Sequence, residues 1–239
     1  MTPFLPMNQL IFDLSLSWFS KIASVTYGLI GVFLTIKFAF LILQMAHASD
    51  YFETIKGAAS YLGMTLAFPI LAKLLIFGAS DIANKIIIPS TRPELEGIGK
   101  YFEIIFASFP LIQFVWKIAD ILVLNIAWAF HTVLISVLIA ISPLIFFGAM
   151  MTDFSTGVRP YFTTLGSLCL WPILWNILGA LSVGVLSSIN SAPITSFCFY
   201  IVFHMLQLLS PIFCFSLLKN LNLDMGSRTA MKLGGKLWN

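Results

Sequence analysis

A long run without acidic or basic side chains fills the second half of the chain and limits what it can fold into. The 59 residues from Pro160 to Leu218 include no Asp, Glu, Lys or Arg, and their only polar cluster is Ser187 to Ser196. With a rise of about 1.5 Å per helical residue and a hydrocarbon core of about 30 Å, this run can form two membrane-spanning helices and a turn. Ile121 to Thr152 is a second uncharged run, of 32 residues. We therefore predict a membrane protein.

The composition supports this prediction. Hydrophobic residues make up 59% of the 239 residues and charged residues only 10%, against about a quarter in a soluble domain. Strand-like alternation in segments of about ten residues, typical of outer-membrane barrels, is absent from the sequence. The predicted fold class is all-α: a polytopic helical membrane protein with five or six transmembrane helices and an N-terminal amphipathic helix.

Hydropathy divides the chain into three parts. Residues 1–20 are expected to be an amphipathic segment whose helix, at about residues 4–19, lies on the bilayer. Residues 21–218 form the transmembrane domain, with spans expected at about residues 22–46, 58–78, 121–150, 161–186 and 196–218. Residues 104–116 are apolar but short, which leaves a sixth span, a re-entrant segment or an interfacial helix open. Residues 219–239 form a tail.

The tail is basic and sets the expected orientation. It carries Lys219, Arg228, Lys232 and Lys236 against a single acid, Asp224. Because positive charge near span ends favours the cytoplasm, we expect a cytoplasmic C-terminus. Six spans would place the N-terminus inside, which the distribution of Lys and Arg favours, and five spans would place it outside.

No arrangement of residues in the sequence indicates an enzyme. Intramembrane proteolysis needs a serine with a histidine base, an HExxH zinc helix or paired membrane aspartates, and none of these is recognisable. No glycine-rich phosphate loop occurs either. We expect no catalytic residue, no metal and no cofactor, and we expect His131 and His204 to be interior histidines bonded to neighbouring helices.

Three cysteines lie in the longest apolar run and do not indicate a zinc site or a disulfide framework. We expect them to be small packing residues: Cys169, Cys198 and Cys214.

Four charged residues in or near the apolar runs are candidates for a cavity or an interface: Lys37, Lys73, Lys117 and Asp120. Lys117 and Asp120 are three positions apart, which puts them on one face of a helix. A charge near the middle of a bilayer costs about 2.5 to 3.5 kcal/mol on insertion scales. These side chains therefore either extend to the headgroups or face a cavity or a subunit interface.

Small residues recur every fourth position in two predicted helices, which allows helix backbones to approach closely. The two sets serve either packing within the chain or contact between subunits, and they are Ser20, Ser24 and Gly28, then Ala180, Gly184 and Ser188.

One segment carries a resemblance to a known family. Ile141 to Phe147 is a helix end with a proline-aliphatic-aromatic run, Asp153 to Phe162 is a short polar loop with an aromatic re-entry, and Leu170 to Ala180 is an apolar helix with a proline. This order resembles the core of the TrbL-type proteins, relatives of the sixth VirB component and of conjugative-transposon TraJ proteins. The motif positions are Pro143, Asp153, Gly157, Arg159 and Pro172.

The resemblance implies an inner-membrane structural and translocation subunit of a type IV secretion or conjugation apparatus. It implies about five spans, an N-terminus outside, a periplasmic segment at residues 79–120 and a cytoplasmic C-terminus. The implied partners are the lipid bilayer, further copies of the chain, the ATPases and pilin or stalk proteins of the apparatus, and a transferred protein or DNA-protein substrate. Two alternatives stay open: an autonomous small-solute or ion channel or transporter, and a phage-borne membrane protein.

Overall fold

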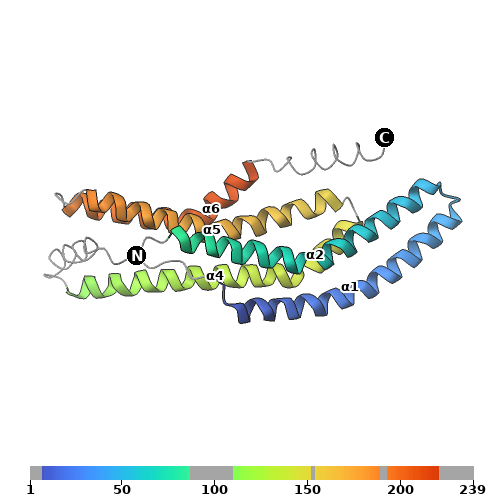
Figure 1. Cartoon of the computed structure of the whole chain (residues 1–239), viewed down its shortest axis with the longest axis horizontal. Helices are drawn as coiled ribbons and strands as arrows, with labels where there is room; N and C mark the ends of the chain where they lie inside the picture. The colour runs from blue at the N-terminus through green and yellow to red at the C-terminus, as the bar shows by residue number, and fades with distance from the viewer. Residues whose placement is uncertain (1–6, 87–109, 152–153, 189–192, 221–239) are drawn as a thin grey trace.

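The structure is a bundle of long α-helices (Figure 1). This computed structural model describes residues 7–86, 110–151, 154–188 and 193–220. Within these ranges the elements are α1 (Gln9–Leu43), α2 (Ala48–Ile86), α4 (Pro110–Met151), α5 (Phe154–Ser188) and α6 (Pro193–Asn220). All five are long and apolar enough to cross a membrane. The predicted fold class, an all-α polytopic helical membrane protein, is confirmed.

Helices α1 and α2 form a hairpin whose turn follows from local hydrogen bonding. The Asn8 side chain accepts a hydrogen bond from the Leu10 N–H at 2.9 Å and so caps the start of α1. At the other end Met45 adopts a positive φ of 48°, and the Ala46 N–H donates to the Leu41 carbonyl at 3.0 Å. This left-handed residue after the last helical turn stops α1 and reverses the chain into α2.

The structure joins two segments that hydropathy separates. The helix expected on the bilayer surface at residues 4–19 and the span expected at residues 22–46 are, from Gln9 onward, one continuous helix, α1. The reason lies in its aromatic side chains, because Phe12 and Phe19 are buried against Phe77 and Phe68 of α2. The amphipathic character of this segment therefore comes from packing on another helix.

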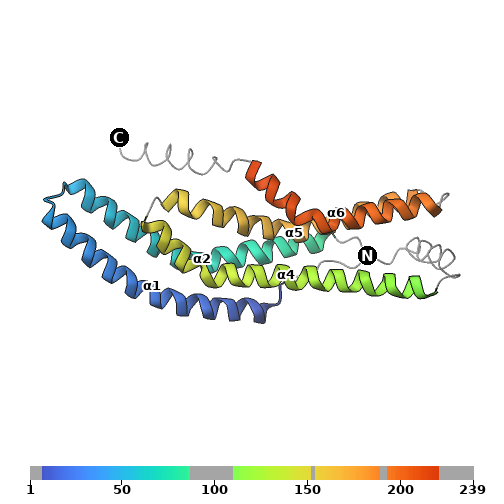
Figure 2. The same ribbon diagram turned by 180° about the vertical axis from the view of Figure 1, so that it is seen from behind.

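Neighbouring helices alternate in direction and are staggered along the long axis. Figures 1 and 2 show α1, α4 and α6 running one way and α2 and α5 the other. The α1–α2 hairpin extends beyond the other helices at one end, while α5, α6 and the first half of α4 extend beyond it at the opposite end. The most extensive packing joins α5 to α6 and α1 to α4. Helices α1 and α6 thus occupy largely different positions along the long axis of the molecule.

The short apolar segment at residues 104–116 lies partly outside the described residues. Its residues 110–116 are the first turns of α4, which has 42 residues and would reach about 63 Å, twice the thickness of a hydrocarbon core. Figure 2 shows the last third of α4 bending away from its first part, and Pro143 lies inside this helix. A proline ring removes a backbone donor, which accounts for the bend.

An aromatic cluster forms the centre of the bundle where the staggered halves overlap. Phe68 of α2 is fully buried, and its ring centroid lies 5.3 Å from that of Phe146 on α4 and 5.8 Å from that of Tyr161 on α5. The Phe146 and Tyr161 rings meet edge to face at 5.6 Å. Since each ring comes from a different helix, this cluster fixes the heights of α2, α4 and α5 relative to one another.

Candidate functional site

Helix α5 is bonded to each of its three neighbours through polar side chains. His131 Nε2 of α4 lies 2.9 Å from the Leu168 carbonyl oxygen. Asn176 Nδ2 donates to the Ala83 carbonyl of α2 at 3.1 Å, and Gln207 Nε2 of α6 donates to the Trp175 carbonyl at 3.1 Å. We call His131, Asn176 and Gln207 the α5 polar contacts. All three side chains are buried.

These hydrogen bonds, rather than the hydrophobic effect, hold the helices in a specific arrangement. Lipid tails are as apolar as leucine, so burying an apolar side chain between two helices gains little over leaving it in lipid. A side-chain hydrogen bond across helices contributes roughly 0.6 to 2 kcal/mol there. The α5 polar contacts therefore orient α2, α4 and α6 around α5 and make it the central helix.

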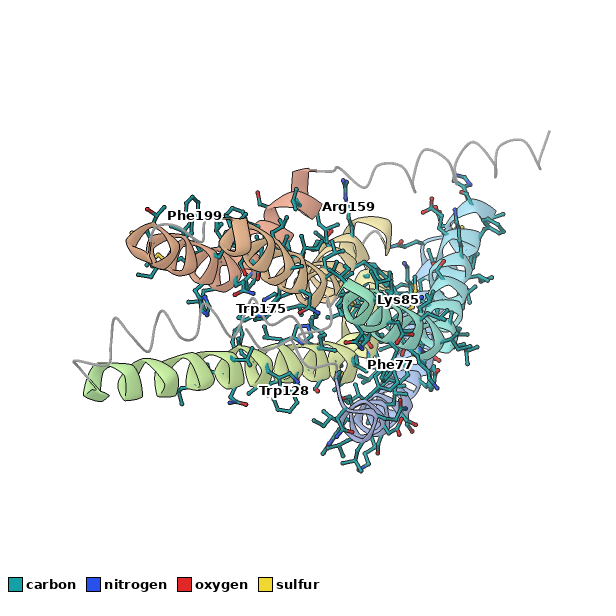
Figure 3. All side chains as sticks on the ribbon, turned by 60° about the vertical axis from the view of Figure 1, so that its left-hand side comes forward. Phe77, Lys85, Trp128, Arg159, Trp175 and Phe199 are labelled. Atoms are coloured by element: carbon teal, nitrogen blue, oxygen red, sulfur yellow. The ribbon has the colours of Figure 1, made fainter. Side chains whose placement is uncertain are left out.

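Further polar groups lie near His131. Its ring meets the Trp171 ring edge to face, with centroids 5.2 Å apart. On the same helix, Trp128 Nε1 and Thr132 Oγ1 are buried and have no hydrogen-bond partner among the described residues. Figure 3 shows Trp128 on α4 and Trp175 between α4 and the pair formed by α5 and α6. Because buried polar groups normally find a partner, this is where the chain can admit water or a polar group.

The sequence predicted an interior role for His131 from its place in an apolar span, and its bond to Leu168 agrees with that role. Asn176 and Gln207 were not singled out as site residues. The available signal was an amide side chain in the middle of an uncharged run, which in lipid needs a partner.

The motif residues with described side chains lie in α4 and α5. Pro143 and Pro172 are buried inside these helices, and the Tyr161 hydroxyl of α5 donates to the Leu138 carbonyl of α4 at 3.1 Å. Arg159 is exposed beside Tyr161 and is labelled on α5 in Figure 3. Gly157 lies in the first turn of α5, and Asp153 lies outside the described residues.

The four charged candidates do not converge on one described site. Lys37 is half-buried, with its Nζ 5.6 Å from the centre of the Phe33 ring, and the stacked rings of Phe38 and Tyr51 place it near the hairpin turn. Lys73 is exposed on α2. Lys117 and Asp120 lie in the first part of α4, where the structure describes the backbone but not these side chains.

Within the chain, helices approach each other closely at glycines that lie outside the two four-residue sets. Ser20, Ser24 and Gly28 lie exposed on α1, and a Cβ at Gly28 or Gly184 would meet nothing within 4 Å. Ala180 is partly buried on α5, and Ser188 is the last residue of that helix. A Cβ at Gly166 would instead lie 3.3 Å from Leu218 Cδ1, and one at Gly179 would lie 3.3 Å from Gln207 Nε2. These two glycines allow α6 to approach α5.

The cysteines are free thiols, with Cys169 and Cys214 buried and Cys198 exposed. Across the described ranges no group of three or more His, Cys, Asp or Glu side chains is placed to hold a metal ion. The geometry of the site therefore consists of helix packing, hydrogen bonds across helices and a small set of unpartnered polar atoms around His131.

Comparison with family models, with curated proteins and with solved structures finds no match to this chain.

Proposed function

We propose that this chain is a structural and translocation subunit of a type IV secretion or conjugation apparatus, of the TrbL type, and that it works in the bacterial inner membrane as a homo-oligomer. The observation that carries this proposal is the length over which apolar side chains are exposed. At the hairpin turn Met45 is 90% exposed, and at the opposite end of the molecule Phe199 is 38% exposed.

The hydrocarbon core of a bilayer is thinner than this surface is long. Helix α4 alone would reach about 63 Å, against about 30 Å of hydrocarbon. Exposed apolar side chains continue along both protruding parts, for example Phe40 and Phe52 on the hairpin and Val202 and Met205 on α6. Large apolar surfaces outside lipid mark contact with other proteins. A subunit of a larger assembly has such contacts, whereas an autonomous carrier does not.

The position of the motif segment supports the same proposal. The residues that resemble the TrbL-type core, from Ile141 to Ala180, lie in α4 and α5 around the central aromatic cluster. Helix α5 contacts α2, α4 and α6. The segment with the resemblance is thus the part on which the other helices pack.

The proposal includes an orientation and a set of partners. Five crossings with a cytoplasmic C-terminus agree with the basic tail at residues 219–239. In this arrangement the tail meets anionic lipid or the ATPases of the apparatus, and pilin or stalk proteins assemble on the periplasmic side. The transferred substrate is a protein or a DNA-protein complex.

The test is to purify the chain in mild detergent and measure the mass of the protein component. We expect an oligomer that co-purifies with secretion-system subunits, and flanking genes that encode ATPases and pilin-like proteins. A monomer that transports a small solute in liposomes would contradict the proposal and favour the autonomous transporter. A phage-tail gene setting would favour the phage-borne alternative. Reporter fusions at Glu94 and Asn190 test the orientation separately.

A further inference from the structure

Two opposite charges on neighbouring helices lie at the same depth of the bundle. The Phe68 ring of α2 is stacked on Phe19 of α1 at 5.6 Å, so these two residues share one level. Asp13 lies six residues before Phe19, or about 9 Å along the axis, and Lys73 lies five residues after Phe68, or about 8 Å. Because α1 and α2 are antiparallel, both displacements point in the same direction (Figures 1 and 2).

The two charges are not paired within the described chain. Asp13 accepts a hydrogen bond from Gln9 Nε2 of its own helix at 3.0 Å. No ion pair joins Asp13 or Lys73 to another described residue, and both side chains are exposed. The side chains next to them on the helix surface are apolar and exposed: Leu10 at 75%, Leu14 at 58%, Ile70 at 65% and Leu74 at 67%.

The stagger of the helices sets the depth of these charges in the bilayer. The Phe68 ring also lies 5.8 Å from that of Tyr161, which brings α5 to the same level. From this level α1 continues about 15 Å to Gln9, and α5 continues about 10 Å in the opposite direction to Phe154. Their overlap of about 25 Å is close to the roughly 30 Å of a hydrocarbon core, so a bilayer that both helices cross lies there. Asp13 and Lys73 are then at the depth of the acyl chains.

An unpaired charge at this depth is costly. On insertion scales a charge in the middle of a bilayer costs about 2.5 to 3.5 kcal/mol. A lysine can extend along apolar surface to the headgroups, but the short side chain of Asp13 cannot. Charged residues inside membranes therefore usually pair with one another. Since the described chain does not supply the partner of Asp13, we look for it on another chain.

A second copy of the chain carries the opposite charge at the matching depth. Copies inserted with one orientation are related by an axis along the membrane normal, so each residue keeps its depth from copy to copy. Asp13 of one copy is therefore within about 2 Å in depth of Lys73 of the next, whereas Lys21 lies about 12 Å away in depth. Within about 15 Å of the Phe68 level, Asp13 is also the only acid on α1 and α2.

We propose that Asp13 of one copy forms an ion pair with Lys73 of the neighbouring copy, and that this pair sets the contact between copies in the homo-oligomer. The oligomer and the five crossings come from the proposed function, on which this inference rests. The apolar side chains around both charges keep water from the pair, which strengthens the attraction. The pair thus determines both the neighbouring helix and the height at which two copies meet.

The first experiment asks whether the two positions meet between copies. A chain with Asp13→Cys and a chain with Lys73→Cys, both in a Cys198→Ser background, are produced together and treated with a short bifunctional maleimide. We expect a cross-linked dimer that forms only when both chains are present. In the matched control Lys56→Cys replaces Lys73→Cys. It is also an exposed lysine of α2, but it lies about 26 Å further along the helix and should give no dimer.

The mass of the same preparation in mild detergent separates this inference from the proposed function. An oligomer without the cross-linked dimer would overturn the ion pair and leave the homo-oligomer standing. Equal cross-linking in chains that carry Asp13→Cys alone would bring like residues together at the interface and overturn the pair as well. A monomer would contradict the proposed function, and the pair with it.

The second experiment reverses the charges. Asp13→Lys or Lys73→Asp alone leaves like charges facing each other and should weaken association at least about 100-fold, measured by dilution of the oligomer in detergent. The double variant Asp13→Lys/Lys73→Asp restores opposite charges and should recover most of the wild-type affinity. Lys56→Asp is the control and should leave association unchanged.

A double variant that associates no better than the single variants would overturn the proposal. If a single variant does not fold, recovery of a folded oligomer by the double variant supports the pair, and failure to recover it contradicts the pair.

Discussion

Helices α1 and α5 have the same length but differ in how much of each is buried inside the protein. Both have 35 residues, and α1 is the more apolar of the two. Yet 44% of the most apolar stretch of α5 is buried inside the protein, against 11% in α1. The less apolar helix is the central one because its polar side chains and carbonyls bond to three neighbours. In a membrane protein, hydropathy therefore indicates which segments enter lipid, and polar contacts indicate which helix lies inside.

The largest expected effect is at the aromatic cluster beside α5. Replacing the fully buried Phe68 by alanine removes ring contacts with α1, α4 and α5 and should lower the free energy of unfolding by about 3 kcal/mol. Thermal unfolding in detergent measures the loss. Phe40→Ala on the exposed face of α1 is the control and should change stability by no more than about 0.5 kcal/mol. Similar losses for both variants would mean that the buried aromatic cluster contributes no more to stability than an exposed ring on α1.

The next effect concerns the α5 polar contacts. Asn176→Leu and Gln207→Leu replace the amides by apolar side chains and remove the bonds to Ala83 and Trp175, so each should cost about 1 kcal/mol and the pair about 2 kcal/mol. Unfolding by added SDS measures each variant. Met205→Leu, an exposed change on α6, should leave stability unchanged. If the leucine variants were more stable than the wild type, α5 would be held by packing alone.

A smaller effect is expected at the polar contact between α1 and α2. The Thr26 and Tyr61 hydroxyls are hydrogen-bonded to each other, and both residues are fully buried. A double-mutant cycle with Thr26→Val and Tyr61→Phe should give a coupling energy of about 0.6 kcal/mol. A coupling above that of the α5 polar contacts would mean that α1 is fixed as firmly as α5.

The last prediction separates contact within the chain from contact between copies. Gly28→Ala adds a methyl group where nothing lies within 4 Å, so the stability of the single chain should stay the same or rise by up to about 1 kcal/mol. Gly179→Ala, with Gln207 Nε2 at 3.3 Å, is the matched change in α5 and should lower stability. The mass of the detergent complex is measured for both variants. A lower mass for Gly28→Ala alone would place the exposed face of α1 in a subunit interface.

The sequence was sufficient to predict the helical membrane fold, because long uncharged runs have few other solutions. It did not reveal that α1 is continuous, since Phe12 and Phe19 are equally suited to a bilayer surface and to the α2 surface that they contact. The four-residue spacing at Gly28 and Gly184 left contact within the chain and contact between subunits open, and within the chain Gly166 and Gly179 approach a neighbour. A spacing of four residues identifies a helix face but not what lies opposite it.

The candidate site was predictable only in part for a similar reason. An uncharged histidine or amide within an apolar run must find a hydrogen-bond partner, and this requirement predicts an interior role for His131. The partner itself is a carbonyl of another helix. Every residue has a carbonyl, so the sequence carries no mark of Leu168, Ala83 or Trp175 as acceptors. Such acceptors become visible only when the register between helices is known.

The stagger between the α1–α2 hairpin and the α5–α6 pair bears on the abundance of the protein in the cell. In the proposed assembly, other subunits cover the apolar side chains of both protruding parts. When the chain is synthesised without those subunits, we expect membrane proteases to remove it, so that its abundance follows that of the scarcest of them.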